Sequence, residues 1–439
     1  SENNAPEAQN NNNNNQPPRE KRKKTTKRPR RGRLVNAEKL PGLTYLDELP
    51  FAEGGFAEVY RGALASKQGT VAVAIKVMEY AIPVGVDPGT KGYSAGSDGE
   101  TSGEDPGDDD KKSGGRVPGG GGGEEGEDAA KKKASASDEA VDMMSVGGTG
   151  RQTVLSSGPK GEQKNRDFAK TAKREVDIVR RLKHANIVTY LMDHTGPLSM
   201  ITTGSGKSRE SKKDQQKTEQ KVAPTVQWQT IIVSEFCTCG SLRQVLRERV
   251  LVDHSNAMRT AEGQKCIVEQ IASGMNYLHS KRVVHGDLKA SNVLLQPDRN
   301  RPSQFIAKIG DFGTAKIIAP PLTSDTMTRI NGTVTHMAPE LLAEKRTSFH
   351  SDVYSFAILL WEIATGGLNP FAGVSPVNVI IAVVKHDLRP LFPEGATPML
   401  GFLATRCWTA DPAARPSFDE IIQTIQMLDV DLDEGEGDA

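Results

Sequence analysis

The sequence has few aromatic residues and few cysteines, and it carries no net charge. Aromatic residues make up 5% of the 439 positions, and 56 Lys and Arg balance 56 Asp and Glu. The four cysteines are Cys237, Cys239, Cys266 and Cys407. Their spacing fits neither a zinc site nor a disulfide scaffold, which excludes small metal-stapled and disulfide-stapled folds. A reducing, intracellular setting is therefore expected.

Long apolar runs are also absent. No stretch reaches the roughly 18 apolar residues of a membrane span, and the longest, such as residues 377–384, suit a protein core. No secretory signal opens the chain, which begins with Ser1 rather than Met and so leaves open a longer native protein. We expect a cytoplasmic or nuclear protein, or the cytoplasmic part of a longer membrane protein whose span lies outside this chain.

Hydrophobic residues form 36% of the chain, a low share for a wholly globular protein. The deficit lies in polar segments that cannot repay the entropy of ordering. They are an Asn-rich, basic arm (1–40), two insertions (85–165 and 202–222) and an acidic tail (431–439). We predict that the arm and both insertions are disordered and that the acidic tail is solvated. The arm alone could be a solvated tail, a nuclear-import signal, a nucleic-acid patch or the flank of a membrane helix.

The remaining sequence, residues 41–430, changes from strand patterns to helix patterns along its length. Val71 to Met78 is rich in β-branched residues and predicts a buried strand with one cation, Lys76. A helical repeat of apolar residues from Phe168 to Leu182 places Glu175 beside the apolar face. Two further strands are predicted at Asn186–Met192 and Thr230–Phe236, and long helices are predicted later, as at Ala261–His279. This order predicts an α+β fold with a β-rich N-terminal lobe, one main helix in that lobe and a mostly helical C-terminal lobe, with a ligand cleft between the lobes.

A polar cluster interrupts the apolar stretch VVHGDLKASNVLL, residues 283–295. It contains Asp287, Lys289 and Asn292, and a second acidic triplet, DFG, begins at Asp311. A carboxylate, an ammonium group and an amide on one loop suit a proton acceptor, a phosphate contact and a metal ligand. A second carboxylate on the next loop suits a divalent cation. This equipment is typical of phosphoryl transfer, where positioning and charge neutralisation supply most of the catalysis.

With these motifs in order, residues 41–430 resemble a eukaryotic protein kinase, apart from the two insertions. The stretches IIVSEFCTCGSL and SDVYSFAILLWEIATG resemble the tyrosine-kinase-like group, most of whose members phosphorylate serine and threonine. The resemblance implies a two-lobed protein-kinase fold. It also implies a serine/threonine kinase that uses ATP and Mg²⁺ and acts on protein substrates.

The resemblance assigns the catalytic and metal-binding roles residue by residue. Asp287 would accept or orient the proton of the substrate hydroxyl, and Lys289 would hold the γ-phosphate. Asn292 would bind the second metal ion, and Asp311 would bind both.

The same resemblance assigns the nucleotide-binding residues. Lys76 would contact the α- and β-phosphates and pair with Glu175, Ser234 would gate the back of the pocket, and residues 235–237 would form the hinge. The glycine-rich loop departs from the pattern G-x-G-x-x-G-x-V, because alanines stand at two of its three glycine positions. The full expected set is Ala52, Gly54, Ala57, Val59, Ala74, Lys76, Glu175, Ser234, Glu235, Cys237 and Leu294.

Structural roles follow from the resemblance as well. Glu340 would form a buried ion pair with Arg415, Asp352 would brace the catalytic loop, Thr333 would lie near Asp287 and Lys289, and Val179 would take the regulatory-spine position.

Gly286 stands where most kinases have arginine. That arginine pairs with a phosphorylated residue of the activation loop, so Gly286 predicts activity that depends less on such phosphorylation.

Two other functions stay open. One is a pseudokinase or nucleotide-binding scaffold, which the depleted glycine-rich loop and Gly286 would favour. The other is an interaction protein whose basic arm and insertions recruit regulatory partners, a role compatible with catalysis. Nucleic acid is not an expected ligand.

Overall fold

The computed structural model describes residues 40–47, 49–53, 57–84, 159–201, 225–252, 257–320, 324–326 and 332–433. All of them belong to one unit of the chain, Val35–Ala439. The expected basic arm up to residue 39, Gly54, residues 85–158 of the first insertion and the whole of the second insertion lie outside these ranges.

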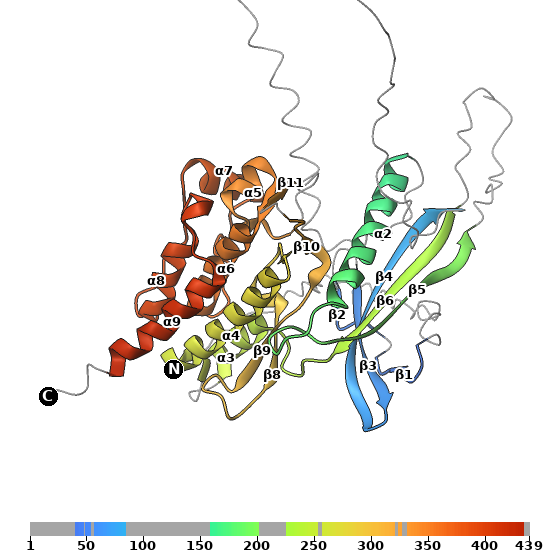
Figure 1. Ribbon diagram of the computed structural model, residues 1–439, viewed down its shortest axis with the longest axis horizontal. Coiled ribbons are helices and arrows are strands. Elements are labelled where there is room, and N and C mark those ends of the chain that lie inside the picture. Colours follow the sequence, from blue (N-terminus) through green and yellow to red (C-terminus); the bar gives the residue numbers. More distant parts are fainter. Residues whose placement is uncertain are drawn as a thin grey trace, which may run out of the picture. The chain divides into compact units, whose positions relative to one another are not determined.

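The N-terminal half forms one antiparallel sheet of six strands (Figure 1). Its order is β1-β3-β4-β6-β5, and β2 pairs with β3. The strands are β1 (Leu43–Tyr45), β2 (Ala52–Glu53), β3 (Glu58–Ser66), β4 (Gly69–Pro83), β5 (Tyr190–Ile201) and β6 (Thr225–Glu235). Alternation of buried and exposed residues along β4 puts Val73, Ile75 and Val77 in one small core.

Helix α2 (Pro159–Val179) packs against β4 through buried residues that include Ala169, Ala172 and Val176. The first insertion was expected to end at residue 165, but residues 159–165 belong to α2 and are helical. These residues lack an apolar repeat, so the sequence pattern did not predict a helix there. Side-chain pairing supports the helix there instead, since Gln163 donates a hydrogen bond to Asp167 four residues later.

The C-terminal half is mostly helical, as expected. Its helices are α3 (Leu242–Val252), α4 (Ala261–Ser280), α5 (Pro339–Glu344), α6 (Phe349–Ala364), α7 (Pro376–Lys385), α8 (Pro398–Cys407) and α9 (Phe418–Asp433). Helix α6 is buried on nearly all sides, and a capping box between Ser348 and Ser351 fixes its start. Because α9 continues to Asp433, the first residues of the expected acidic tail are helical.

Short strand pairs position the polar loops. Strand β7 (Val283–Val284) pairs with β10 (Lys316–Ile317), and β8 (Val293–Pro297) pairs with β9 (Phe305–Ile309). The cluster from His285 to Asn292 therefore spans β7 to β8 and ends in the 3₁₀ turn η5 (Ala290–Asn292). Strand β9 leads into Asp311 and the turn η6 (Phe312–Thr314). A third pair joins β11 (Ser324–Thr326) to β12 (Arg346–Ser348).

The two-lobed α+β architecture is confirmed, but two strand boundaries were wrong. A strand was expected at Asn186–Met192, whereas β5 begins at Tyr190, and β6 begins five residues before the expected Thr230. The polar ends of β5 and β6 carry no strand signal of their own, and their pairing with each other and with β4 extends them. Among the described helices, none has the length and apolar content to cross a membrane.

Candidate active site

The loop before Asp287 is fixed by a carboxylate of the buried helix α6. Asp352 is fully buried, and its two oxygens accept hydrogen bonds from the backbone N–H groups of His285 (2.8 Å) and Gly286 (2.9 Å). Gly286 has φ +76°, a left-handed conformation that costs glycine little. The bracing expected of Asp352 is thus present in the structure.

Asp287 lies at the centre of a hydrogen-bonded group. Lys289 Nζ is 2.5 Å from Asp287 Oδ2 and 2.6 Å from Thr333 Oγ1. The backbone N–H of Thr333 donates to Asp287 Oδ1 over 2.9 Å. Asn292 Nδ2 donates to the Asp287 backbone carbonyl at 2.8 Å, which leaves the Asn292 amide oxygen as the acceptor atom of that side chain.

His285 connects this loop to the segment that carries Asp311. Its ring is fully buried, and Nδ1 accepts from the backbone N–H of Asp287 at 3.3 Å. Nε2 therefore carries the proton and donates to the Gly310 carbonyl at 3.1 Å. The ring also packs edge-on against Phe312, with ring centres 5.4 Å apart. His285 is therefore a structural link rather than a group free for proton transfer.

Lys76 bridges two carboxylates that are distant in the sequence. Its Nζ lies 2.6 Å from Glu175 Oε1 on α2 and 2.8 Å from Asp311 Oδ1. Burial would lower the pKa of Lys76, but the two carboxylates outweigh it and raise that pKa. The charge of Lys76 lowers the pKa of Asp311 to about 2. Burial, the largest influence on Glu175, raises the pKa of that carboxyl, and Lys76 offsets the rise only in part.

The expected nucleotide-binding residues occupy adjacent positions on the sheet. Ala74 and Ser234 are register partners on β4 and β6, and Val59 is the partner of Lys76 and of Ala52. Ala57 lies just before β3. Leu294 belongs to the other half, on β8, where it bridges to Ser241.

Two side chains of the expected hinge, Glu235 and Cys237, are engaged in contacts or buried. Glu235 accepts a hydrogen bond from the Thr189 backbone N–H (2.7 Å) and pairs with Lys308 (2.9 Å). Burial alone would raise the pKa of Glu235, but these two contacts outweigh burial and lower that pKa. Burial raises the pKa of the Cys237 thiol to about 12, so this thiol is not a nucleophile at neutral pH.

Sequence reasoning missed Glu362, a carboxylate inside the apolar helix α6. It accepts from the Ala290 backbone N–H at 2.8 Å and lies 3.1 Å from His336 Nε2. It thereby joins the catalytic loop to the turn η7 (Val334–His336). A lone charge in the run LLWEIA was a usable signal, because a buried charge requires a partner.

The expected Glu340–Arg415 ion pair is present and buried. The two guanidinium Nη atoms lie 2.8 and 2.9 Å from the two carboxylate oxygens, and the Arg415 side chain is fully buried. The pair anchors α5, which follows the segment that ends at Ala338.

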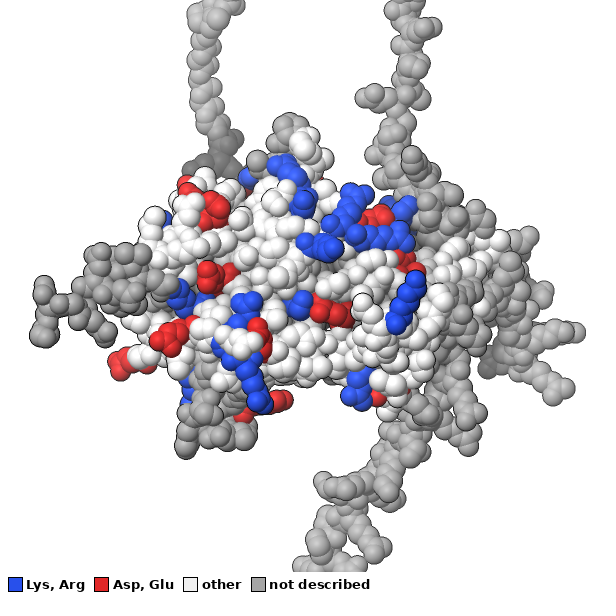
Figure 2. Space-filling model, turned by 60° about the horizontal axis from the view of Figure 1, so that its bottom comes forward, with Lys and Arg blue, Asp and Glu red and all other residues white. Residues whose placement is uncertain are grey.

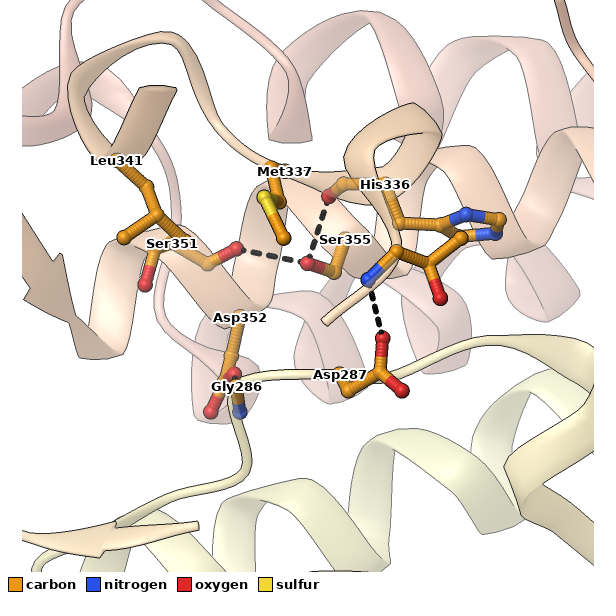
Figure 3. A pocket seen from close by; sticks show the side chains of 9 residues that line it. Gly286, Asp287, His336, Met337, Leu341, Ser351, Asp352 and Ser355 are labelled. Atoms are coloured by element: carbon orange, nitrogen blue, oxygen red, sulfur yellow. Dashed lines mark hydrogen bonds between the residues drawn. The ribbon is translucent and has the colours of Figure 1, made fainter. Parts of the chain in front are cut away.

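A small pocket lies next to Asp287, lined by the loop that carries Asp287, by residues of the turn η7 and by helix α6 (Figure 3). Ser355 donates to the backbone carbonyls of His336 and Ser351 on its wall. Gly286 lines the same pocket.

Charge on the surface is not uniform. Figure 2 shows several Lys and Arg side chains gathered on one part of the face, with acidic side chains scattered among and around them. The mixture of charges on the face shown in this view does not single out one class of charged ligand.

A β-rich half holding a Lys–Glu ion pair and a helical half holding HGDLKASN and DFG together define the protein kinase class. Residues 215–425 match the family described as protein tyrosine and serine/threonine kinase, so this part of the chain is a protein kinase domain. This confirms the resemblance inferred from the motifs.

Several curated kinases are similar to the chain. Serine/threonine-protein kinase STY17 of Arabidopsis thaliana is 30% identical over 61% of this chain and 39% of its own length. Serine/threonine/tyrosine-protein kinase HT1 of the same plant is 36% identical over 46% of this chain and 48% of its own length. Mitogen-activated protein kinase kinase kinase 12 of Rattus norvegicus is 30% identical over 67% of this chain and 28% of its own length. The chain thus spans less than half of each relative.

Proposed function

We propose that the chain is an active serine/threonine protein kinase that transfers the γ-phosphoryl group of MgATP to protein hydroxyl groups. The observation that carries the proposal is the placement of the Asp287 carboxylate between Lys289 Nζ and the Thr333 backbone N–H. An ionised carboxylate held in place beside a cation is the arrangement needed to orient a hydroxyl nucleophile.

The residues present fit a divalent metal. The Asn292 amide oxygen and the Asp311 carboxylate are hard oxygen ligands of the kind that Mg²⁺ prefers. Bound Mg²⁺ would neutralise negative charge on the phosphates. Lys76 would contribute a positive charge to the same phosphates while Glu175 holds its ammonium group in position.

The alternative is a pseudokinase or nucleotide-binding scaffold. Ala52 and Ala57 in the glycine-rich loop favour it, because each adds a methyl group where bare backbone approaches phosphates. Against it, Lys76, Glu175 and Asp311 form the connected ion-pair cluster that phosphate and metal binding would use.

Regulation is proposed to depend little on activation-loop phosphorylation. Gly286 offers no cation for a phosphate, and Lys316 is already paired with Asp325 at 2.9 Å. Of the threonines in this segment, Thr323 and Thr328 lie outside the described residues, and Thr326 lies on β11.

The remaining assignments are parts of the same proposal. Residues 41–430 form the catalytic domain, and the arm and insertions are sites for regulatory partners. The protein works in the cytoplasm or nucleus, or as the cytoplasmic part of a longer membrane protein.

The test is incorporation of phosphate from labelled ATP into a general serine- and threonine-containing protein, with Mg²⁺ present. Wild type is compared with Asp287→Ala and Lys76→Met. We expect incorporation by wild type only, with label on serine and threonine. Equal incorporation by all three proteins would refute the enzyme, and label on tyrosine alone would refute the specificity.

A further inference from the structure

Arg174 lies next to Glu175 on α2 but contacts a different segment. Its Nη2 donates a hydrogen bond to the backbone carbonyl of Gly313 at 3.2 Å. Gly313 is two residues after Asp311. Two consecutive residues of α2 therefore reach the Asp311 segment, Glu175 through Lys76 and Arg174 through the backbone.

The Asp311 segment needs such support. Asp311 has φ +61° and ψ +76°, a left-handed conformation that residues with a Cβ rarely adopt. A strained conformation of this kind persists only where surrounding contacts hold it. On one side His285 binds the Gly310 carbonyl. Arg174 supplies the corresponding contact on the other side, at Gly313.

Gly313 lies beside the charged cluster. A Cβ placed on it would be in ordinary contact with Glu175 Oε2 (3.5 Å), Asp311 Oδ1 (3.6 Å) and Lys76 Nζ (3.7 Å). Because only Phe312 separates Gly313 from Asp311 in the chain, a shift of the Gly313 backbone would displace the carboxylate of Asp311. The hydrogen bond from Arg174 fixes the backbone at this point.

Stability alone does not account for arginine at this position. Among the residues that the structure describes, Arg174 Nε is buried and has no hydrogen-bond partner. An unsatisfied buried donor is destabilising, and an apolar side chain would avoid that cost. Burial also lowers the pKa of the guanidinium group, although arginine stays charged. A buried guanidinium group with an unsatisfied donor, placed beside the site, points to a role in the site.

We propose that Arg174 is a positioning residue that holds the Asp311–Gly313 segment against α2 and so keeps the Asp311 carboxylate oriented for metal-bound nucleotide. The inference rests on the proposed kinase function. It adds a second link between α2 and this segment, independent of the Lys76–Glu175 pair.

The test compares Arg174→Met, which keeps the apolar stem without charge or donors, with Arg174→Lys, which keeps a charge on a shorter reach. Arg166→Met is the matched control, an exposed arginine on the same helix. Melting temperatures are measured for each protein alone, with ADP, and with ADP and Mg²⁺. The readout is the extra rise in melting temperature that Mg²⁺ adds to the effect of ADP.

We expect Arg174→Met to lose at least half of that Mg²⁺-dependent rise, Arg174→Lys to lose less, and Arg166→Met to match wild type. A full Mg²⁺-dependent rise in folded Arg174→Met would overturn the inference. If Arg174→Met does not fold, Arg174→Gln, which lacks both the charge and the reach of arginine, takes its place, and a full rise in folded Arg174→Gln overturns the inference. A wild type with no Mg²⁺-dependent rise would overturn it as well.

Kinetics give a second readout. In Arg174→Met, kcat should fall by about tenfold or more, the effect of one charge-assisted hydrogen bond, with little change in the KM for protein. An unchanged kcat would contradict the positioning role. If wild type transfers no phosphate but the Mg²⁺-dependent rise still depends on Arg174, the enzyme proposal fails and the positioning role stands.

Discussion

Replacing Glu340 with alanine should strongly destabilise the protein, because it leaves a buried guanidinium group without its carboxylate. Arg415 is fully buried, and both of its Nη atoms bond to Glu340. Arg415 also donates hydrogen bonds to three backbone carbonyls, those of Thr409, His350 and Ala410.

The magnitude follows from that environment. Removing one partner of a buried ion pair typically costs about 3–5 kcal/mol. The three carbonyl contacts and the ring of Tyr354, 5.3 Å from the Arg415 guanidinium carbon, still solvate the cation. We therefore expect the lower end, about 3 kcal/mol. In a domain of this size that lowers the melting temperature by about 5 °C.

The assay is urea and thermal unfolding of Glu340→Ala beside Glu344→Ala. Glu344 is also on α5, and its carboxylate pairs with Arg346 at 3.2 Å with both side chains more than half exposed. Loss of that surface pair should cost less than about 1 kcal/mol. A Glu340→Ala loss no larger than that of Glu344→Ala would refute the account of the buried pair.

Three further predictions concern the loops. Gly286→Ala should lower the free energy of unfolding, measured in urea, by about 1–2 kcal/mol, because alanine is strained at φ +76°. As a control, Gly401→Ala in helix α8 should leave the free energy of unfolding unchanged or raise it. Because Lys76 lowers the pKa of Asp311 to about 2, the ionised carboxylate stabilises the fold above about pH 4 and loses that effect as the pH falls toward 2. The urea-unfolding gap between wild type and Asp311→Asn should thus shrink from pH 6 to pH 3, and a constant gap would contradict this. Phosphatase-treated wild type should keep its kinase activity. Kinase activity should fall several-fold in Asp325→Ala, because Lys316 then lacks the carboxylate that pairs with it. Loss of kinase activity on phosphatase treatment of wild type would refute phosphorylation-independent control.

The parts of the fold with strong local patterns could be predicted. The long helix expected at Ala261–His279 corresponds to α4, which ends one residue later. The β-branched run from Val71 to Met78 predicted β4, although not its full length. The outer ends of β5 and β6 could not be found, because pairing between strands, rather than local composition, defines them.

The candidate site likewise contains contacts that the sequence could predict and contacts that it could not. Ordered motifs predicted the pairing of Lys76 with Glu175, since a cation in a buried strand requires a partner. The contact from Arg174 to Gly313 was not predictable, because it joins a side chain to a backbone carbonyl 139 residues away and leaves no pattern in the sequence. Gly54 and the part of the activation loop outside the described residues remain predictions from sequence alone.

The most direct test of the central claim uses Asp287→Asn, which replaces the carboxylate by an amide of nearly equal size. Phosphate transfer to serine and threonine is compared with wild type at saturating MgATP, after ADP-induced thermal shifts show that both proteins are folded and bind nucleotide. The account predicts transfer by wild type and a loss of about 10²-fold or more in the variant. Transfer by Asp287→Asn at the wild-type rate, or no transfer by a nucleotide-binding wild type, would contradict it.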